Sequence, residues 1–262
     1  MTPDHPTFQS AIVRPPASNF AAGLTTQDLG QPSFEKALQQ HASYCQALLD
    51  CGLELTELPA DPEFPDSTFV EDTAILTPRG AILARPGAAS REGEVVAMRP
   101  ALALFYDNLA EIKAPGTLDG GDICEAGEHF FIGISERTNQ AGAKQLADFL
   151  SQLGYTSNFV DIRGVRGILH LKSGIAYLGE GRLALIDALA DQPAFRRYDI
   201  IHLESQENYA ANCVRINNYV LTAAGFPRFH QALQAAGYQL LPLEMSEYQK
   251  MDGGLSCLSL RF

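Results

Sequence analysis

Basic residues are scarce in this 262-residue chain. Lysine and arginine together number 19, against 31 aspartates and glutamates, so the formal net charge is −12. Nucleic acids and anionic membrane surfaces are bound through basic faces, and this deficit argues against both as partners. A negative cleft attracts small cations instead. Taken alone, the charge is also explained by a solvated acidic surface.

Cysteine pairs and long apolar runs are missing as well. No two of the five cysteines have Cys-x-x-Cys spacing and their number is odd, so we expect neither a disulfide framework nor a zinc knuckle. No apolar run approaches the length of a membrane span, and the N-terminus lacks the basic start and apolar stretch of a signal peptide. These absences predict a reduced, cytoplasmic protein. The length allows one compact domain over residues 1–262. The oligomeric state stays open, a homodimer included.

One order of elements recurs along the chain at roughly 40–50 residues, a period typical of radial or stacked arrays. Each unit has a polar loop, a hairpin, a helix and a strand. In the clearest copy, the loop at 116–122 precedes a hairpin at 123–134, a helix at 140–153 and a strand at 155–162. The other helices are expected at 33–51, 92–110, 193–197 and 227–236, with Pro100 kinking its helix or starting a second one. The other strands are expected at 11–14, 53–58, 73–77, 81–84, 111–114, 200–203 and 239–243, with hairpins turning at 179–181 and 217–218.

The fifth unit begins at 251–254 and runs to the C-terminus, and the N-terminal strand and first helix complete it. Each unit holds a helix, which is too much for a four-stranded propeller blade, and the units differ too much for a solenoid. A closed ring of five ββαβ units fits better, and its class is α/β. In such a ring, the loops before the hairpins point to one end of the central axis. They carry Asp66, Glu71, Asp72, Asp119, Asp122, His170, Glu204, Asn212 and Cys257.

Cys257 follows a glycine turn, where the alternation of residues 255–260 predicts that a strand begins. Position alone favours a small buried hydrophobic residue. Its register with the repeat favours a function, because polar residues of ordinary loops do not follow a repeat. A cysteine nucleophile needs a thiolate, which an imidazole can generate. His170 occupies the matching loop two units away, although a histidine between two leucines is often a core residue.

Two groups of acidic residues accompany this pair. Asp119 or Asp122 can orient the imidazole, although Asp-Gly sequences also form plain turns. No metal is expected, because nothing resembles a spaced pair of ligands. Glu71 and Asp72 lie in an apolar context, where carboxylates need a cation. A guanidinium suits them, because it pairs with carboxylates in a bidentate way.

Arginines near the same loops suggest a site for a carboxylate. Arg91 and Arg137 flank elements beside the acidic loops and have the geometry to bind a carboxylate. Solvated surface arginines are an equally good interpretation from the sequence.

Several long motifs resemble dimethylarginine dimethylaminohydrolases, of the pentein superfamily of guanidine-modifying enzymes. The similarity covers nearly the whole chain, with the motifs in the order of that family. They are Phe-Pro-Asp-Ser-x-Phe-Val-Glu-Asp (64–72), Leu-Asp-Gly-Gly-Asp (118–122), Ile-Gly-x-Ser-x-Arg-Thr-Asn (132–139), Leu-His-Leu-Lys-Ser (169–173), Tyr-Ala-Ala-Asn-Cys (209–213) and Asp-Gly-Gly-x-Ser-Cys-x-Ser-Leu-Arg-Phe (252–262).

The resemblance implies a five-fold pseudosymmetric α/β propeller around a central active-site channel. It also implies hydrolysis of Nω-methylated arginines to citrulline and a methylamine, with neither metal nor cofactor. Cys257 would attack the guanidinium carbon, His170 would be the general acid and then the base, and Asp119 would support His170. Some bacterial relatives carry glutamate at the place of Asp119. The aspartate side chain is shorter and therefore reaches less far toward His170. The substrate, a small cationic amino acid, would be held by Asp66, Glu71, Asp72, Arg91, Arg137 and the main-chain oxygens of Leu24 and Met251.

Two alternatives remain from the sequence. Another guanidine or ureido hydrolase on the same scaffold, such as an arginine deiminase or a citrulline hydrolase, is the nearer one. The chain lacks the helical insert of the deiminases, and this favours a dimethylarginine dimethylaminohydrolase over an arginine deiminase. A non-catalytic pentein that acts as a binding module is the other. The presence of Cys257, His170 and both acidic sites argues against it.

Overall fold

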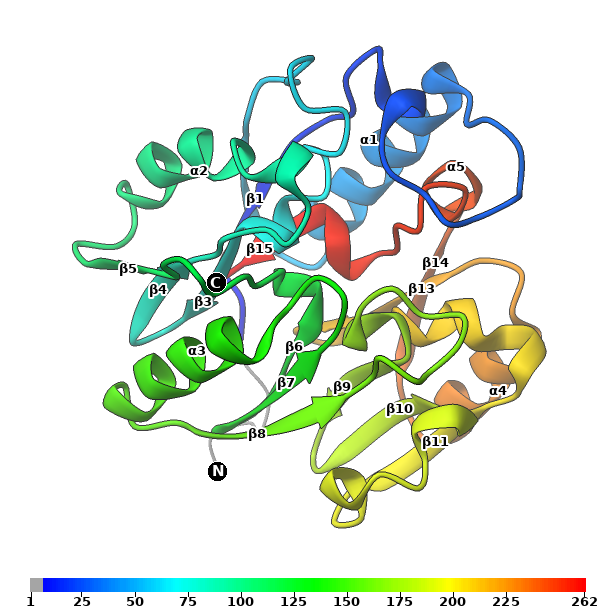
Figure 1. The fold of residues 1–262 in the computed structure, drawn as a ribbon. Helices are drawn as coiled ribbons and strands as arrows, with labels where there is room; N and C mark the ends of the chain where they lie inside the picture. The colour runs from blue at the N-terminus through cyan, green and yellow to red at the C-terminus, as the bar shows by residue number, and fades with distance from the viewer. Residues whose placement is uncertain (1–6) are drawn as a thin grey trace.

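Five three-stranded sheets surround a central axis in the computed structural model, which describes residues 7–262 (Figure 1). All five sheets are built in the same way. In the second unit, β6 (Ile123–Ala126) and β7 (His129–Ile134) form an antiparallel hairpin. Strand β8 (Thr156–Asp161) returns after a helix and pairs in parallel with β7. In each of the four sheets that contain a hairpin, the middle strand is the second strand of that hairpin.

The other units repeat this pairing. The first contains β3 (Ala74–Thr77), β4 (Gly80–Leu83) and β5 (Leu109–Glu111). The third and fourth contain β9 (Ile175–Gly179), β10 (Arg182–Ile186) and β11 (Asp199–Leu203), then β12 (Val214–Ile216), β13 (Tyr219–Ala223) and β14 (Gln239–Leu243).

The two ends of the chain close the ring. Strand β1 (Ser10–Val13) pairs antiparallel with β15 (Ser259–Arg261) and parallel with β2 (Glu54–Glu57). Figure 1 shows the blue N-terminal strand beside the red C-terminal one. The predicted ring of five ββαβ units, a pseudosymmetric α/β propeller, is confirmed.

Helices lie on the outside of the sheets. Helix α1 (Phe34–Asp50) begins at Ser33, whose hydroxyl accepts the Lys36 N–H. Helix α3 (Gln140–Gln152) begins at Asn139, whose side chain accepts the Gly142 N–H. Such caps satisfy amides that have no partner within the helix. The remaining helices are α2 (Glu94–Leu102), α4 (Pro227–Ala235) and α5 (Ser246–Gln249).

The hydrophobic core is divided among the units. In the second unit, Leu146 and Leu150 of α3 pack on Phe130 and Ile132 of β7, and all four side chains are buried. Burying an aliphatic or aromatic side chain of this size contributes about 1.5–3 kcal/mol. Helix α3 therefore covers the sheet of its own unit, and the inter-unit loops are left to build the centre. Within residues 7–262, no helix has both the length and the apolar character needed to cross a membrane.

Four predicted elements were wrong in extent. The helix expected at 92–110 ends at Leu102, just after Pro100, and the strand that follows is 109–111 rather than 111–114. Proline removes a helix hydrogen bond and crowds the preceding turn, which favours termination. The helix of the third unit, expected at 193–197, is a 3₁₀ turn at Pro193–Phe195. The last strand begins at Ser259, because residues 256–258 form another 3₁₀ turn.

Candidate active site

Five 3₁₀ turns, one before each hairpin, form the centre of the ring. Each contacts at least one neighbouring turn, so the five loops together close the central channel. The turns are Val70–Thr73, Gly120–Asp122, Leu171–Ser173, Ser205–Ala211 and Ser256–Leu258.

Neighbouring residues of these turns face opposite ends of the channel. Asp72 and Cys257 line a front cavity of about 30 Å³. Glu71 and Ser256, their neighbours in sequence, line a back cavity of about 130 Å³. The turns therefore form a partition with a different set of side chains on each side.

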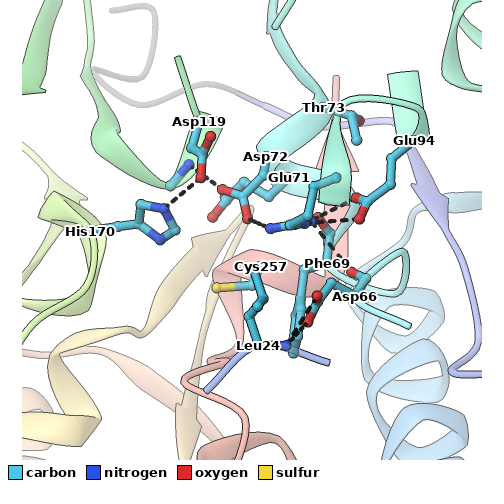
Figure 2. Close-up of polar contacts among 12 residues, drawn as sticks. Leu24, Asp66, Phe69, Glu71, Asp72, Thr73, Glu94, Asp119, His170 and Cys257 are labelled. Atoms are coloured by element: carbon cyan, nitrogen blue, oxygen red, sulfur yellow. Dashed lines mark hydrogen bonds and ion pairs between the residues drawn. The ribbon is translucent and has the colours of Figure 1, made fainter. Parts of the chain in front are cut away.

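The front cavity gathers eight of the ten residues to which the family resemblance assigns a role, and Figure 2 shows part of this group. Asp119 does not line the cavity but contacts His170 from behind. Glu71 lines the back cavity instead. The predicted residues that line the cavity are Leu24, Asp66, Asp72, Arg91, Arg137, His170, Met251 and Cys257.

His170 is held by Asp119. The ring Nε2 lies 2.9 Å from Asp119 Oδ2, and the other oxygen of Asp119 accepts the Gly87 N–H at 2.8 Å. The shorter aspartate side chain therefore reaches the imidazole. Asp122 accepts the N–H of Leu171, the residue that follows His170, at 3.0 Å. Of the two aspartates considered from the sequence, Asp119 contacts the ring and Asp122 holds the backbone beside it.

The charge of His170 follows from its neighbours. Burial alone lowers the pKa of an imidazole, but Asp72, the hydrogen bond to Asp119, and Asp122 outweigh it and raise the pKa of His170 to about 9. The ring is therefore a cation at neutral pH, and it carries a proton that it can give to a leaving group.

Cys257 has the opposite tendency. Burial, together with the carboxylates of Glu71 and Asp72, raises the pKa of the Cys257 thiol to about 12. The protein without substrate therefore holds a thiol, not a thiolate. A cation placed beside the sulfur lowers this pKa, because it stabilises the charged form.

Asp72 forms the acidic wall of the front cavity. Its Oδ2 lies 2.6 Å from Arg91 Nη1, and its Oδ1 accepts the Gly121 N–H at 2.8 Å. Burial alone raises the pKa of this carboxyl, but His170 and Arg91 lower it to about 2. A Cβ on Gly121 would lie 2.8 Å from Nδ1 of His170 and 2.9 Å from Oδ1 of Asp72, so only glycine allows this approach.

Arg91 is anchored more firmly than the sequence indicates. Glu94 binds it in a bidentate way, with distances of 2.9 Å to Nε and 2.8 Å to Nη2. Its Nη2 also donates to the carbonyl of Phe69 at 3.1 Å (Figure 2). Sequence reasoning missed Glu94, although its place three residues after Arg91 is a spacing that brings helical side chains together. Arg137 forms no ion pair with any residue from 7 to 262, so its guanidinium is the free cation of the cavity.

Glu71 does not act beside Asp72. Its carboxylate lies 2.6 Å from Lys172 Nζ and 3.1 Å from Arg261 Nη2, and it accepts the Ser256 hydroxyl at 2.8 Å. The expectation that Glu71 and Asp72 hold one guanidinium together disagrees with this geometry. Consecutive residues of the turn leave it in opposite directions, so Glu71 is part of the back cavity.

Residues 17–31, named here the lid loop, are tied to the front cavity at two points. The Leu24 N–H donates to both carboxylate oxygens of Asp66, at 3.1 Å each. The Thr26 N–H and hydroxyl donate to the carboxylate of Asp252 at 2.5 and 3.0 Å. Because Leu24 and Asp252 both line the cavity, these bonds close the loop over it.

Asp72, Asp119 and His170 also satisfy the spacing of a metal site. One ligand atom from each lies within 4.8 Å of the others. The contacts of Asp72 with Arg91 and of Asp119 with His170 already account for this cluster.

Comparisons with known proteins identify the family of the chain. Residues 39–172 match the family model described as arginine deiminase. The chain is 43% identical to the N(G),N(G)-dimethylarginine dimethylaminohydrolase of Pseudomonas aeruginosa, over 97% of this chain and 100% of that one. It is 33% identical to the enzyme of the same name from Streptomyces coelicolor, over 97% and 96% of the two chains.

Solved structures give the same result. The Pseudomonas enzyme, in a cysteine-to-serine mutant complexed with citrulline, superposes with a TM-score of 0.95 at 42% identity, over 98% of this chain and 100% of that one. The N-terminal domain of the arginine dihydrolase ArgZ from cyanobacteria, bound to its product, superposes with a TM-score of 0.87 over 98% and 97% of the chains. Its identity is only 18%, so it shows the shared fold. The ring, the cavity and these relatives together show that the chain belongs to the dimethylarginine dimethylaminohydrolase family.

Proposed function

We propose that the protein hydrolyses Nω-methylated arginines, asymmetric dimethylarginine and monomethylarginine, to citrulline and dimethylamine or methylamine. The observation that carries the proposal is the front cavity, which brings a cysteine, a charged imidazole and a buried carboxylate around one space. The names of the relatives support the same reaction. In this proposal residues 1–262 form one catalytic domain. All five cysteines are free, which supports our placing the protein in the cytoplasm.

The substrate binds with its charges matched along the cavity. Its guanidinium pairs with Asp72, and Arg137 receives its carboxylate, with Arg91 fixed beside it. Asp66 and the main-chain oxygens of Leu24 and Met251 hold the amino group. The front cavity has a volume of only about 30 Å³ with the lid loop in place. In this proposal the lid loop opens for binding and closes again before the reaction.

The first step forms a covalent bond to the enzyme. The bound guanidinium favours loss of the thiol proton to solvent, and the Cys257 sulfur bonds to the guanidinium carbon. The C–N bond to the methylated nitrogen breaks, and His170 gives its proton to the departing amine. The product on the enzyme is a positively charged thiouronium, which Asp72 stabilises in the same place as the substrate.

The second step returns the cysteine. His170, now neutral, accepts a proton from water as the oxygen bonds to the same carbon. The C–S bond breaks, the remaining hydroxyl proton passes to the Cys257 sulfur to restore the thiol, and citrulline leaves. Asp119 keeps the imidazole in position through both proton transfers.

Citrulline release from asymmetric dimethylarginine and from arginine, measured side by side, tests the proposal. We expect the methylated substrate to be preferred and Cys257→Ser to abolish release. Equal or faster release from arginine would favour a deiminase, for which the family match at residues 39–172 is the specific observation. No citrulline from either substrate would contradict the proposal and favour a citrulline hydrolase or a binding module.

A further inference from the structure

The motif Tyr209-Ala210-Ala211-Asn212-Cys213 supplies the fourth central loop, and the reaction as derived uses none of its residues. Asn212 follows directly after the 3₁₀ turn at Ser205–Ala211 and is 7% exposed. A buried amide of this kind needs partners for both of its ends.

Both ends of the Asn212 amide meet the loop that carries Cys257. Oδ1 accepts the main-chain N–H of Ser256 at 2.8 Å. Nδ2 lies 3.8 Å from Cys257 Sγ, within the distance of a hydrogen bond to sulfur. The side chain therefore bridges two consecutive residues, one through the backbone and one through the nucleophile.

The direction of this bridge is fixed. A main-chain N–H can only donate, so the oxygen of Asn212 must face Ser256. The NH₂ group then faces the sulfur. The usual ambiguity of an amide orientation does not arise here, because the reversed amide would place two donors against each other.

The nucleophile loop is shaped to admit this amide. A Cβ on Gly254 would lie 2.4 Å from Asn212 Cγ, so only glycine fits at this position. The Tyr209 hydroxyl donates to the Gly253 carbonyl at 2.9 Å and joins the same two loops a second time. The Asn212 amide and the loop that carries Cys257 therefore fix each other's position.

We propose that Asn212 is a further catalytic residue, whose amide N–H donates to the Cys257 sulfur, aims it into the front cavity and stabilises the thiolate. The inference rests on the proposed role of Cys257 as nucleophile. A hydrogen bond to a thiolate is charge-assisted and stronger than one to a thiol, so the contribution grows as the sulfur becomes charged. The charged or titratable groups near the sulfur are Glu71, Asp72, Lys172, His170 and Tyr209. Asn212 donates to the sulfur without carrying a charge.

The isosteric variant Asn212→Asp tests the hydrogen bond to the Cys257 sulfur separately from the bond to the Ser256 backbone. It keeps an oxygen for the Ser256 N–H and removes the N–H that faces the sulfur. The same substitution at Asn208, which lies on the same turn and whose Oδ1 has no hydrogen-bond partner among residues 7–262, is the control for an added carboxylate. Circular dichroism shows whether each variant folds.

The rate of Cys257 alkylation by iodoacetamide at about pH 8, followed by mass spectrometry of its peptide, reports the thiolate fraction without any substrate. Loss of a hydrogen bond to a charged group predicts a fall of about tenfold or more for Asn212→Asp. Asn208→Asp should stay near the wild-type rate. We also expect kcat on asymmetric dimethylarginine to fall for Asn212→Asp, with KM little changed.

A folded Asn212→Asp variant with wild-type alkylation and kcat would overturn the inference, as would an equal fall in Asn208→Asp. If Asn212→Asp does not fold, Gly254→Ala makes the test by displacing the amide, and a wild-type alkylation rate there would count against the inference equally. The alkylation readout does not depend on turnover. A wild-type protein that releases no citrulline but shows the alkylation difference would contradict the proposed function and leave the hydrogen bond standing.

Discussion

A histidine that is charged in the folded protein and neutral in the unfolded chain makes stability depend on pH, and His170 is such a residue. Its pKa is about 9 in the fold and 6.5 in the unfolded chain. A raised pKa stabilises the fold fully below pH 6.5, and this stabilisation disappears as the pH rises through 9. One pKa unit corresponds to about 1.4 kcal/mol, so the loss is about 3 kcal/mol.

Urea unfolding of the wild type and of His170→Asn at about pH 6 and about pH 9.5 measures this loss. We expect the free energy of unfolding of the wild type to fall by about 3 kcal/mol more than that of the variant over this range. In the Asp119→Asn variant, the fall should begin at lower pH, because one partner of the imidazolium is gone. Parallel pH profiles for the wild type and His170→Asn would refute the assignment of a charged His170.

Three more changes test the lid loop, the front cavity and the fold. Asp252→Ala removes the anchor of the lid loop, so hydrogen exchange in that loop should accelerate and KM should rise; unchanged exchange would show that the anchor is not needed. Gly121→Ala places a methyl group against His170 and should lower kcat at least tenfold without unfolding the protein, whereas wild-type kcat would mean that the loop yields without effect on the imidazole. Ser33→Ala removes the cap of α1 and should cost about 1 kcal/mol in urea unfolding while kcat is unchanged; equal stability would show that water replaces the cap.

The architecture could be predicted because its signals are local and repeated. Hairpin turns and alternating strands recur along the chain, and Ser33 and Asn139 cap their helices. The errors lie where two local signals compete. Around Pro100, helical periodicity continued in the sequence beyond the point at which the structure ends the helix. At residues 255–260, alternation predicted a strand, but the first half is the 3₁₀ turn that presents Cys257.

That Cys257, His170 and Asp119 come together could also be predicted, since they occupy matching loops and matching motifs. The sequence could not predict which side of the partition each residue faces. Glu71 and Asp72 are adjacent and chemically alike, and only the geometry of the turn sends one to each cavity. The fixed state of Arg91 depends on Glu94 and on carbonyls whose direction no sequence pattern records.

The most direct test of the account is the covalent intermediate itself. Acid quenching during turnover of asymmetric dimethylarginine, followed by mass spectrometry of the peptides, shows which residue carries the amidine carbon. The account predicts a thiouronium adduct on Cys257, formed and lost during turnover, and absent in Cys257→Ser. Citrulline that accumulates with no adduct on Cys257, or with turnover retained in Cys257→Ser, would show that water attacks the substrate directly and would contradict the mechanism.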